Sequence, residues 1–126
     1  MTFTTIHIIY NPHSKGPGKK LARQLQRELF TKHSLHSHIH ATAHAGHGEE
    51  IAYDLSRKDA HPLLISVSGD GGYHDVINGA LKAQQEGLSP FCAVMPAGNA
   101  NDHARVVYSS ELLSSIVHGN TRSIDI

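Results

Sequence analysis

The sequence has little cysteine, no excess of either charge and no long apolar run. Acidic and basic residues balance at 11 each in 126 residues, so no field of one sign indicates a protein that coats DNA or a membrane. No apolar stretch approaches the roughly 20 residues that span a bilayer, and residues 1–5 lack the basic and apolar regions of a signal peptide. We therefore expect a soluble, cytoplasmic chain without nucleic acid among its partners.

The single cysteine, Cys92, excludes an intramolecular disulfide and fits a reducing compartment. It stands in the apolar run of residues 91–95, which predicts a buried, inert thiol rather than a nucleophile. The chemistry of this chain is therefore expected in other residues.

Short apolar runs alternate with stretches of helical spacing along the whole chain. Strands are predicted at residues 6–10, 36–41, 63–67, 91–95 and 123–126, the second of them near a sheet edge. Helices are predicted at about 19–29, 49–57 and 76–81, from near 101, and at 112–117, with a turn at 46–48. The apolar face of the third helix is predicted to hold Val76, Ile77, Ala80 and Leu81. This order predicts one three-layer α/β domain whose mainly parallel sheet is covered on both faces.

Residues 68–72, Ser-Gly-Asp-Gly-Gly, lie between a predicted buried strand and a predicted helix. The glycines permit positive φ, so successive backbone N–H groups can face an anion where the helix begins. The pattern matches neither G-x-x-x-x-G-K-[ST] nor G-x-G-x-x-G, and it favours neither an ordinary P-loop NTPase nor a Rossmann dehydrogenase. A phosphate cradle is the preferred interpretation, with a plain strand-to-helix turn as the alternative. Asp70 can cap the helix or hold a hydrated metal ion beside the phosphates.

Two more loops follow predicted strands, and ligands of open α/β sheets bind at the carboxyl ends of the strands. Residues 11–20 form a basic loop whose Asn, Ser and Lys groups can donate to nucleotide oxygens, although a solvated loop has the same composition. Residues 96–102 combine the permissive Gly98 with Asn101 and Asp102, which can cap a helix or contact a ligand. The convergence of three loops at one edge predicts a nucleotide site.

Three ordered blocks resemble the catalytic-domain family of diacylglycerol kinases and sphingosine kinases. The first resembles Asn-Pro-x-Ser-Gly, through Asn11, Pro12 and Ser14, with Lys15 in place of the first glycine. The second resembles Gly-Gly-Asp-Gly-Thr-x-x-Glu-Val-x-Asn-Gly, through Gly69, Asp70, Gly71, Val76, Asn78 and Gly79, with Asp75 in place of Glu. The third resembles Pro-x-Gly-Thr-Gly-Asn-Asp-x-Ala-Arg, through Pro96, Gly98, Asn101, Asp102, Ala104 and Arg105.

The resemblance implies an N-terminal nucleotide-binding domain similar to those of phosphofructokinase and NAD kinase, which a β-rich domain follows at the lipid site. It implies transfer of the γ-phosphoryl group of ATP to a lipid hydroxyl, that of diacylglycerol or a related lipid, with ATP and Mg²⁺ required. Residues 1–126 then form the first domain without the second, and we expect weak nucleotide binding and little turnover from it. An uncovered apolar surface would favour self-association into a homo-oligomer. A lipid substrate would also allow peripheral association with the membrane.

The resemblance also implies a set of site residues. The expected nucleotide-binding residues are Asn11, Ser14, Lys15, Ser68, Gly69, Asp70, Gly71, Gly72, Gly98, Asn99, Asn101 and Asp102. Asp70 is the expected catalytic residue, because it would hold Mg²⁺ through water or accept the hydroxyl proton. Gly72 stands where the family has Thr, and Asn99 and Ala100 stand where it has Thr-Gly, so phosphate contacts from hydroxyls are lost. A non-catalytic nucleotide-binding or interaction module therefore remains an alternative.

Twelve histidines are the oddity of the composition, and six of them lie between residues 33 and 47. His36, His38 and His40 alternate, which predicts that they share one face of a strand. They could then bind Zn²⁺ or Ni²⁺. A polar edge strand is the alternative, because no cysteine or acidic residue completes a compact site.

Overall fold

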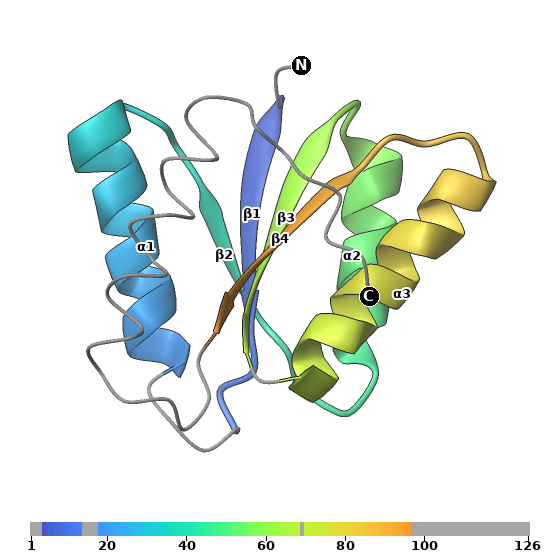
Figure 1. Ribbon diagram of the computed structural model, residues 1–126, viewed down its shortest axis with the longest axis horizontal. Helices are drawn as coiled ribbons and strands as arrows, with labels where there is room; N and C mark the ends of the chain where they lie inside the picture. Colours follow the sequence, from blue (N-terminus) through green and yellow to red (C-terminus); the bar gives the residue numbers. More distant parts are fainter. Residues whose placement is uncertain (1–3, 14–17, 69, 97–126) are drawn as a thin grey trace.

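Strands and helices alternate in the computed structural model, which describes residues 4–13, 18–68 and 70–96 (Figure 1). Their order is β1 (Thr5–Tyr10), α1 (Gly18–His33), β2 (His38–Ala41), α2 (His47–Lys58), β3 (Pro62–Ser68), α3 (Asp70–Gln85) and β4 (Phe91–Pro96). Each described element corresponds to one that the sequence predicts. The strand expected at 123–126 and the helices expected from residue 101 onward lie outside the described residues.

The four described strands form one parallel sheet in the order β2-β1-β3-β4. Helix α1 covers one face of the sheet, and α2 and α3 cover the other (Figure 1). Helix α1 connects β1 to β2, which lies on one side of β1. Helix α2 connects β2 to β3, which lies on the other side of β1. The strand order therefore changes direction between β1 and β3, which is where open α/β sheets bind their ligands. The predicted three-layer α/β architecture is confirmed.

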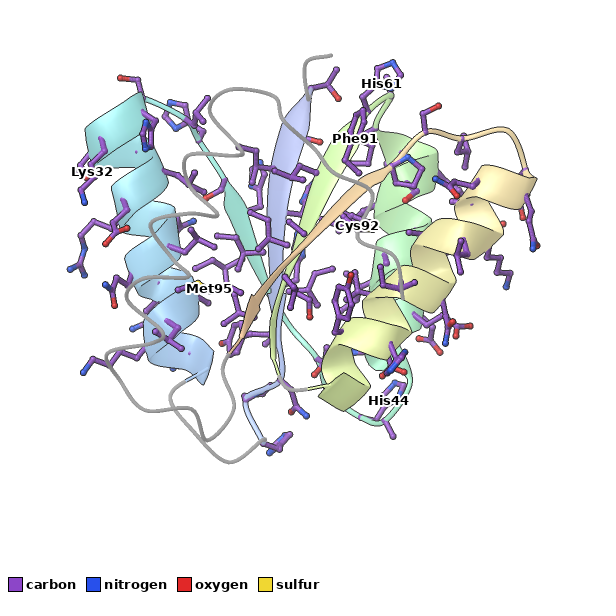
Figure 2. All side chains as sticks on the ribbon, viewed as in Figure 1. Lys32, His44, His61, Phe91, Cys92 and Met95 are labelled. Carbon is purple, nitrogen blue, oxygen red and sulfur yellow. The ribbon has the colours of Figure 1, made fainter. Side chains whose placement is uncertain are left out.

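Alternating side chains of the strands build a core on each face of the sheet. Toward α1, buried residues include Ile8, Tyr10, Leu25, Leu29, Ile65 and Met95. Toward α2 and α3, they include Ile9, Ala52, Leu55, Leu64, Val76 and Ala80. Figure 2 shows the same division, with Met95 on the α1 side and Cys92 on the other. Each fully buried aliphatic side chain contributes about 1.5–3 kcal/mol, so both cores hold the helices to the sheet.

Two glycines allow α2 and α3 to pack closely. A Cβ atom at Gly79 would lie 2.3 Å from the carbonyl oxygen of Glu49 and 2.8 Å from Cβ of Ala52. A Cβ atom at Gly48 would lie 3.2 Å from Cβ of Asp75. Real Cβ contacts do not reach the first two distances, so the glycine of the second sequence block is required by helix packing in this fold.

Three local predictions were wrong in detail. Strand β2 begins at His38 and not at residue 36, because the ring of His36 packs near Phe30 of α1 with 5.1 Å between centroids. The turn predicted at 46–48 lies at Ala45 and Gly46, which has a φ of 81°, since α2 already begins at His47. Leu81 is 48% exposed, because the buried face of α3 is centred on Val76, Ala80 and Ala83 and passes beside it.

None of the helices in the described part of the chain is long and apolar enough to cross a bilayer. The longest are α1 and α3, with 16 residues each. A helix of that length rises about 24 Å, which is less than the hydrocarbon thickness of about 30 Å.

Candidate functional site

The carboxyl ends of three neighbouring strands meet at one edge of the sheet. Asn11 directly follows β1, Ser68 ends β3 and Pro96 ends β4. The register pairs Tyr10 with Val67, and Ser68 with Pro96, so these three positions are adjacent across the sheet. Helices α1 and α3 begin at the same edge, the lower one in Figure 1. The described ends of the three predicted loops therefore converge as expected.

The glycine-rich segment is mostly the first turn of a helix. Strand β3 ends at Ser68 and α3 begins at Asp70, so residues 70–72 are helical and the loop predicted over 68–72 is shorter than expected. Asp70 is the first residue of the helix and not the residue before it. The N–H groups of a first helical turn have no partner within the helix, and they face the side from which the helix starts. That turn can hold an anion at the carboxyl edge of the sheet.

Helix α2 supports this turn from behind. A Cβ atom at Gly48 would lie 3.9 Å from the carbonyl oxygen of Gly72 and 3.7 Å from Cγ2 of Val76. The first turns of α2 and α3 therefore pack against each other at Gly48, which has no side chain to separate them. Gly72, predicted as a nucleotide residue, lies in this first turn of α3, where backbone N–H groups have no partner within the helix.

A basic cleft lies on the other side of the edge, where α1 begins. Its volume is about 800 Å³, and it is lined by Asn11, Pro12, Gly18, Lys19, Lys20, Arg23, Gln24, Arg27 and Glu28. Four of these side chains are cationic and one is acidic. The Oδ1 atom of Asn11 accepts a hydrogen bond from the His13 N–H at 2.8 Å, which turns the chain away from the sheet as an Asx turn does. The cleft is suited to phosphate oxygens, which Lys and Arg side chains bind well.

Seven of the predicted site residues lie outside the described residues. They are Ser14, Lys15, Gly69, Gly98, Asn99, Asn101 and Asp102. For Ser68, Asp70 and Gly71 the structure gives the backbone element alone. Their roles as nucleotide ligands, and that of Asp70 as catalytic residue, stay predictions.

The prediction of an inert thiol at Cys92 agrees with the structure, and its side chain is partly rather than fully buried. Cys92 lies in β4 on the side of the second core, and burial raises the pKa of its thiol to about 12. The thiol therefore stays protonated near neutral pH and is a poor nucleophile. Burial also raises the pKa of Tyr73, to which the nearby Cys92 contributes.

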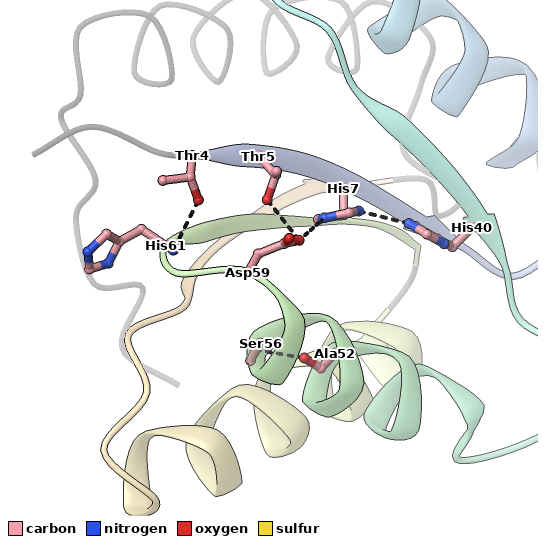
Figure 3. A network of polar contacts seen from close by, with 8 residues as sticks. All are labelled: Thr4, Thr5, His7, His40, Ala52, Ser56, Asp59 and His61. Atoms are coloured by element: carbon pink, nitrogen blue, oxygen red, sulfur yellow. Dashed lines mark hydrogen bonds and ion pairs between the residues drawn. The ribbon is translucent and has the colours of Figure 1, made fainter.

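A polar network lies at the amino end of β1 and β3, away from the carboxyl edge (Figure 3). Nε2 of His7 donates to Oδ2 of Asp59 at 2.8 Å, and the Thr5 hydroxyl donates to the same oxygen at 3.0 Å. Nδ1 of His7 lies 2.9 Å from Nε2 of His40. Because the proton on His7 Nε2 is shared with Asp59, a neutral His7 accepts from His40. His7 is 5% exposed, and its two ring nitrogens are both used.

This network shifts two pKa values downward. Burial, with the charges of His7, His38 and Lys58, lowers the pKa of His40 below its ordinary value of 6.5. Burial by itself would raise the pKa of Asp59, but hydrogen bonds from His7 and Thr5 outweigh it and lower that pKa. At neutral pH the network therefore holds a carboxylate and a neutral His40.

The predicted set His36, His38 and His40 does not form. His38 and His40 share a face of β2, but their third neighbour is His7 of β1, whose ring centroid lies 5.4 Å and 5.0 Å from theirs. The register pairs His7 with His38. The sequence held one signal for this, since His7 is the one polar residue among 6–10 except for the tyrosine hydroxyl.

The comparisons agree with this architecture. The chain has the NAD kinase-like α/β fold of diacylglycerol kinase catalytic domains: a solved diacylglycerol kinase structure from Bacillus anthracis str. Sterne superimposes with a TM-score of 0.58 at 18% identity, over 96% of this chain and 43% of that one. Residues 5–126 match the diacylglycerol kinase catalytic domain family, and the chain belongs to that family. The resemblance carried by the three sequence blocks is thereby confirmed.

Two curated relatives are lipid kinases by name. The chain is 30% identical over 86 residues to a ceramide kinase of Mus musculus. This alignment covers 66% of the chain and 16% of the relative. The chain is 29% identical over 135 aligned positions to sphingosine kinase 1 of Arabidopsis thaliana. This alignment covers 94% of the chain and 27% of the relative. The chain therefore spans about a quarter or less of the length of these relatives.

Proposed function

We propose that this chain is the ATP-binding part of a lipid kinase that transfers the γ-phosphoryl group of ATP to a lipid hydroxyl. The observation that carries the proposal is the convergence of β1, β3 and β4 at one edge of the sheet, beside the first turn of α3. Family membership supports the reaction class. The lipid is diacylglycerol or a related molecule, and the reaction takes place where such lipids lie, at a membrane surface.

The residues at this edge suit the parts of the reaction. N–H groups of residues 70–72 face the phosphates, and the cations of the α1 cleft, Lys19 and Arg23 among them, attract the nucleotide. Asp70 would either hold Mg²⁺ through water, where the ion would supply charge neutralisation at the phosphates, or act as the base that accepts the hydroxyl proton. The lipid oxygen forms a bond to the γ-phosphorus while the bond to the β–γ bridging oxygen breaks, and the hydroxyl proton passes to a carboxylate, for which Asp70 is the candidate.

Calorimetric titration with Mg·ATP tests the binding half of the proposal. We expect weak binding of Mg·ATP and much weaker binding of adenosine, because the site is built around phosphate groups. The cooperative unfolding of the same sample shows that it is folded. A folded chain that binds no Mg·ATP at millimolar concentrations would contradict the proposal.

A phosphorylation assay tests the catalytic half. Diacylglycerol, sphingosine and ceramide are offered in mixed micelles to this chain and to a longer form that carries a β-rich domain of the family. We expect phosphorylated lipid from the longer form and little or none from residues 1–126. Nucleotide binding without any lipid product from either form would favour the second candidate below.

A second candidate is a nucleotide-binding module without kinase activity. The observation that favours it is the loss of hydroxyls, since Gly72 stands where the family has Thr, and Asn99 and Ala100 stand where it has Thr-Gly. The two candidates differ in the effect of Gly72→Thr. A kinase weakened by this loss gains activity in the longer form, whereas a module without a catalytic site gains none.

A further inference from the structure

The turn between β2 and α2 brings two histidines and a glutamate together. His44 precedes α2. His47 and Glu50 lie three residues apart in the first turn of α2, so their side chains are on the same face of the helix. One ligand atom from each of the three side chains lies within 4.8 Å of the others. The rings of His44 and His47 stack, with centroids 4.7 Å apart and planes at 19°. We propose that His44, His47 and Glu50 bind one divalent transition-metal ion, of which Zn²⁺ is the reference case.

The donor set is one that Zn²⁺ uses. Two imidazoles and a carboxylate, with water in the remaining position, form an established zinc coordination sphere. Tetrahedral bonds of about 2.0 Å require ligand atoms about 3.3 Å apart. Rotations of exposed side chains close the remaining gap, since His44 and Glu50 are exposed and His47 is half-buried.

His44 is already held in the tautomer that a metal ligand needs. Its Nδ1 lies 2.9 Å from the carbonyl oxygen of Ala45, and a carbonyl can only accept, so Nδ1 carries the proton. The lone pair is then on Nε2. Metal-binding histidines commonly donate their other ring N–H to a backbone carbonyl in this way, which fixes the ring and raises its basicity.

His47 must give up a hydrogen bond to bind the metal. Its Nδ1 accepts from the N–H of Ala43 at 2.7 Å. A metal on Nδ1 displaces that N–H, and a metal on Nε2 requires a proton on Nδ1, which opposes the same N–H. Either way the Ala43 amide loses its partner, so binding is weaker than at a site without this competition. The loss also provides a signal that belongs to this site alone.

Charge around the turn balances the ion. The positive end of the α2 dipole disfavours a cation at this position, but Glu49 and Glu50 both lie in the first turn of the helix. Figure 2 shows His44 at the edge where α3 begins, and Gly48 of the same turn packs against Asp75. The other histidine group, around His7, differs because both nitrogens of its central ring are already paired.

Zinc titration of the untagged chain tests the proposal. We expect His44→Ala and Glu50→Gln each to weaken the tightest Zn²⁺ site by about tenfold or more, since even partners that only orient a ligand are worth about 10–100-fold. The control is His36→Ala, which removes an exposed histidine that packs near Phe30 of α1 and leaves that site unchanged. Equal zinc affinity in wild type, His44→Ala and Glu50→Gln would overturn the proposal, as would an equal loss in the control.

The amide signal of Ala43 gives a second, local measurement. In ¹H–¹⁵N spectra, Zn²⁺ shifts the Ala43 amide and speeds its hydrogen exchange in the wild type and in His36→Ala, and does neither in His44→Ala. If Zn²⁺ binds while the Ala43 amide stays unchanged, the ion is held by other histidines and the proposal fails. Thermal melting of each variant shows that the effects do not come from unfolding.

Discussion

Gly79 decides how closely two helices of this chain approach each other. The Cβ atom of an alanine there would lie 2.3 Å from the carbonyl oxygen of Glu49, and a backbone oxygen cannot rotate away. We predict that Gly79→Ala lowers the free energy of unfolding by about 1–3 kcal/mol, because α2 and α3 must separate. Urea unfolding measures the change.

The neighbouring residue provides the control for this prediction. Asn78 lies on the exposed side of α3, and Asn78→Ala should change stability by no more than about 0.5 kcal/mol. Equal stability of Gly79→Ala and the wild type would mean that the two helices are not in contact at this point.

Asp70 is the residue on which the proposed chemistry depends most. In the longer, active form we predict that Asp70→Asn reduces turnover at least about a hundredfold, the usual loss when a positioned acid–base group is removed. Its melting temperature should change little, because Asn has nearly the shape of Asp and one charge in the first turn of a helix is worth only about 0.3–1 kcal/mol. Steady-state kinetics and thermal melting are measured together.

Asp54→Asn is the matched control for Asp70→Asn, since it makes the same chemical change at an exposed position of α2. It should leave turnover and melting temperature as they are. A large fall in melting temperature of Asp70→Asn without a kinetic loss would assign Asp70 a structural role instead.

The pairing of β1 with β2 makes the stability of the sheet depend on pH. Burial, together with the charges of His7, His38 and Lys58, lowers the pKa of His40 from 6.5, while Asp59 pairs with His7. The folded chain therefore binds this proton less readily than the unfolded chain does. As the pH falls below 6.5, the unfolded state gains the proton first and stability decreases until the folded pKa is reached. Asp59, whose pKa is lowered from 3.8, adds a further loss at more acidic pH.

We predict that His40→Gln reduces the loss of stability between pH 7.5 and about 5.5. The glutamine amide still donates to Nδ1 of His7 but does not titrate in this range. Melting temperatures across the range measure the slope. His36→Gln, at the exposed histidine beside Phe30, should keep the wild-type slope. A His40→Gln profile that coincides with the wild type would show that His40 does not control this dependence.

The sequence predicts the elements well where they are amphipathic or buried. The spacing of Leu21, Leu25 and Leu29 predicts α1 because a single face of that helix is covered. The start of β2 is predicted wrongly because the alternation of histidines continues before His38, while His36 leaves the sheet to pack on α1. The alternation of residues within a strand does not reveal which of them will pack against a neighbouring helix.

The candidate site divides in the same way. Its loops follow from local signals, glycine and polar residues after apolar runs, and their convergence follows from the rule for parallel sheets. The His7–His40–Asp59 network depends on the register between β1 and β2 and on the position of the end of α2. Those relations join residues more than 30 positions apart, and no pattern within one segment specifies them.

At the scale of the whole molecule, sheet order decides which parts of the chain are needed for folding. We predict that a chain that stops after Ala60 has no cooperative unfolding transition, because β1 then lacks β3 and the apolar side chains of Leu63, Leu64 and Ile65. Circular dichroism during urea titration measures this, with the full chain as the reference. A cooperative transition in the shortened chain would show that β1, α1, β2 and α2 fold without the centre of the sheet.

The interior position of β1 also has a consequence for synthesis. Its residues are the first described strand to leave the ribosome, yet Thr5 pairs with Pro62 and Tyr10 with Val67. Non-local parallel pairing of this kind forms slowly. The run of residues 6–10, which is apolar or aromatic except for His7, thus stays unpaired on the β3 side until more than fifty further residues have been added. During that interval its exposed strand edge is the part of the nascent chain most open to capture by chaperones or by other chains.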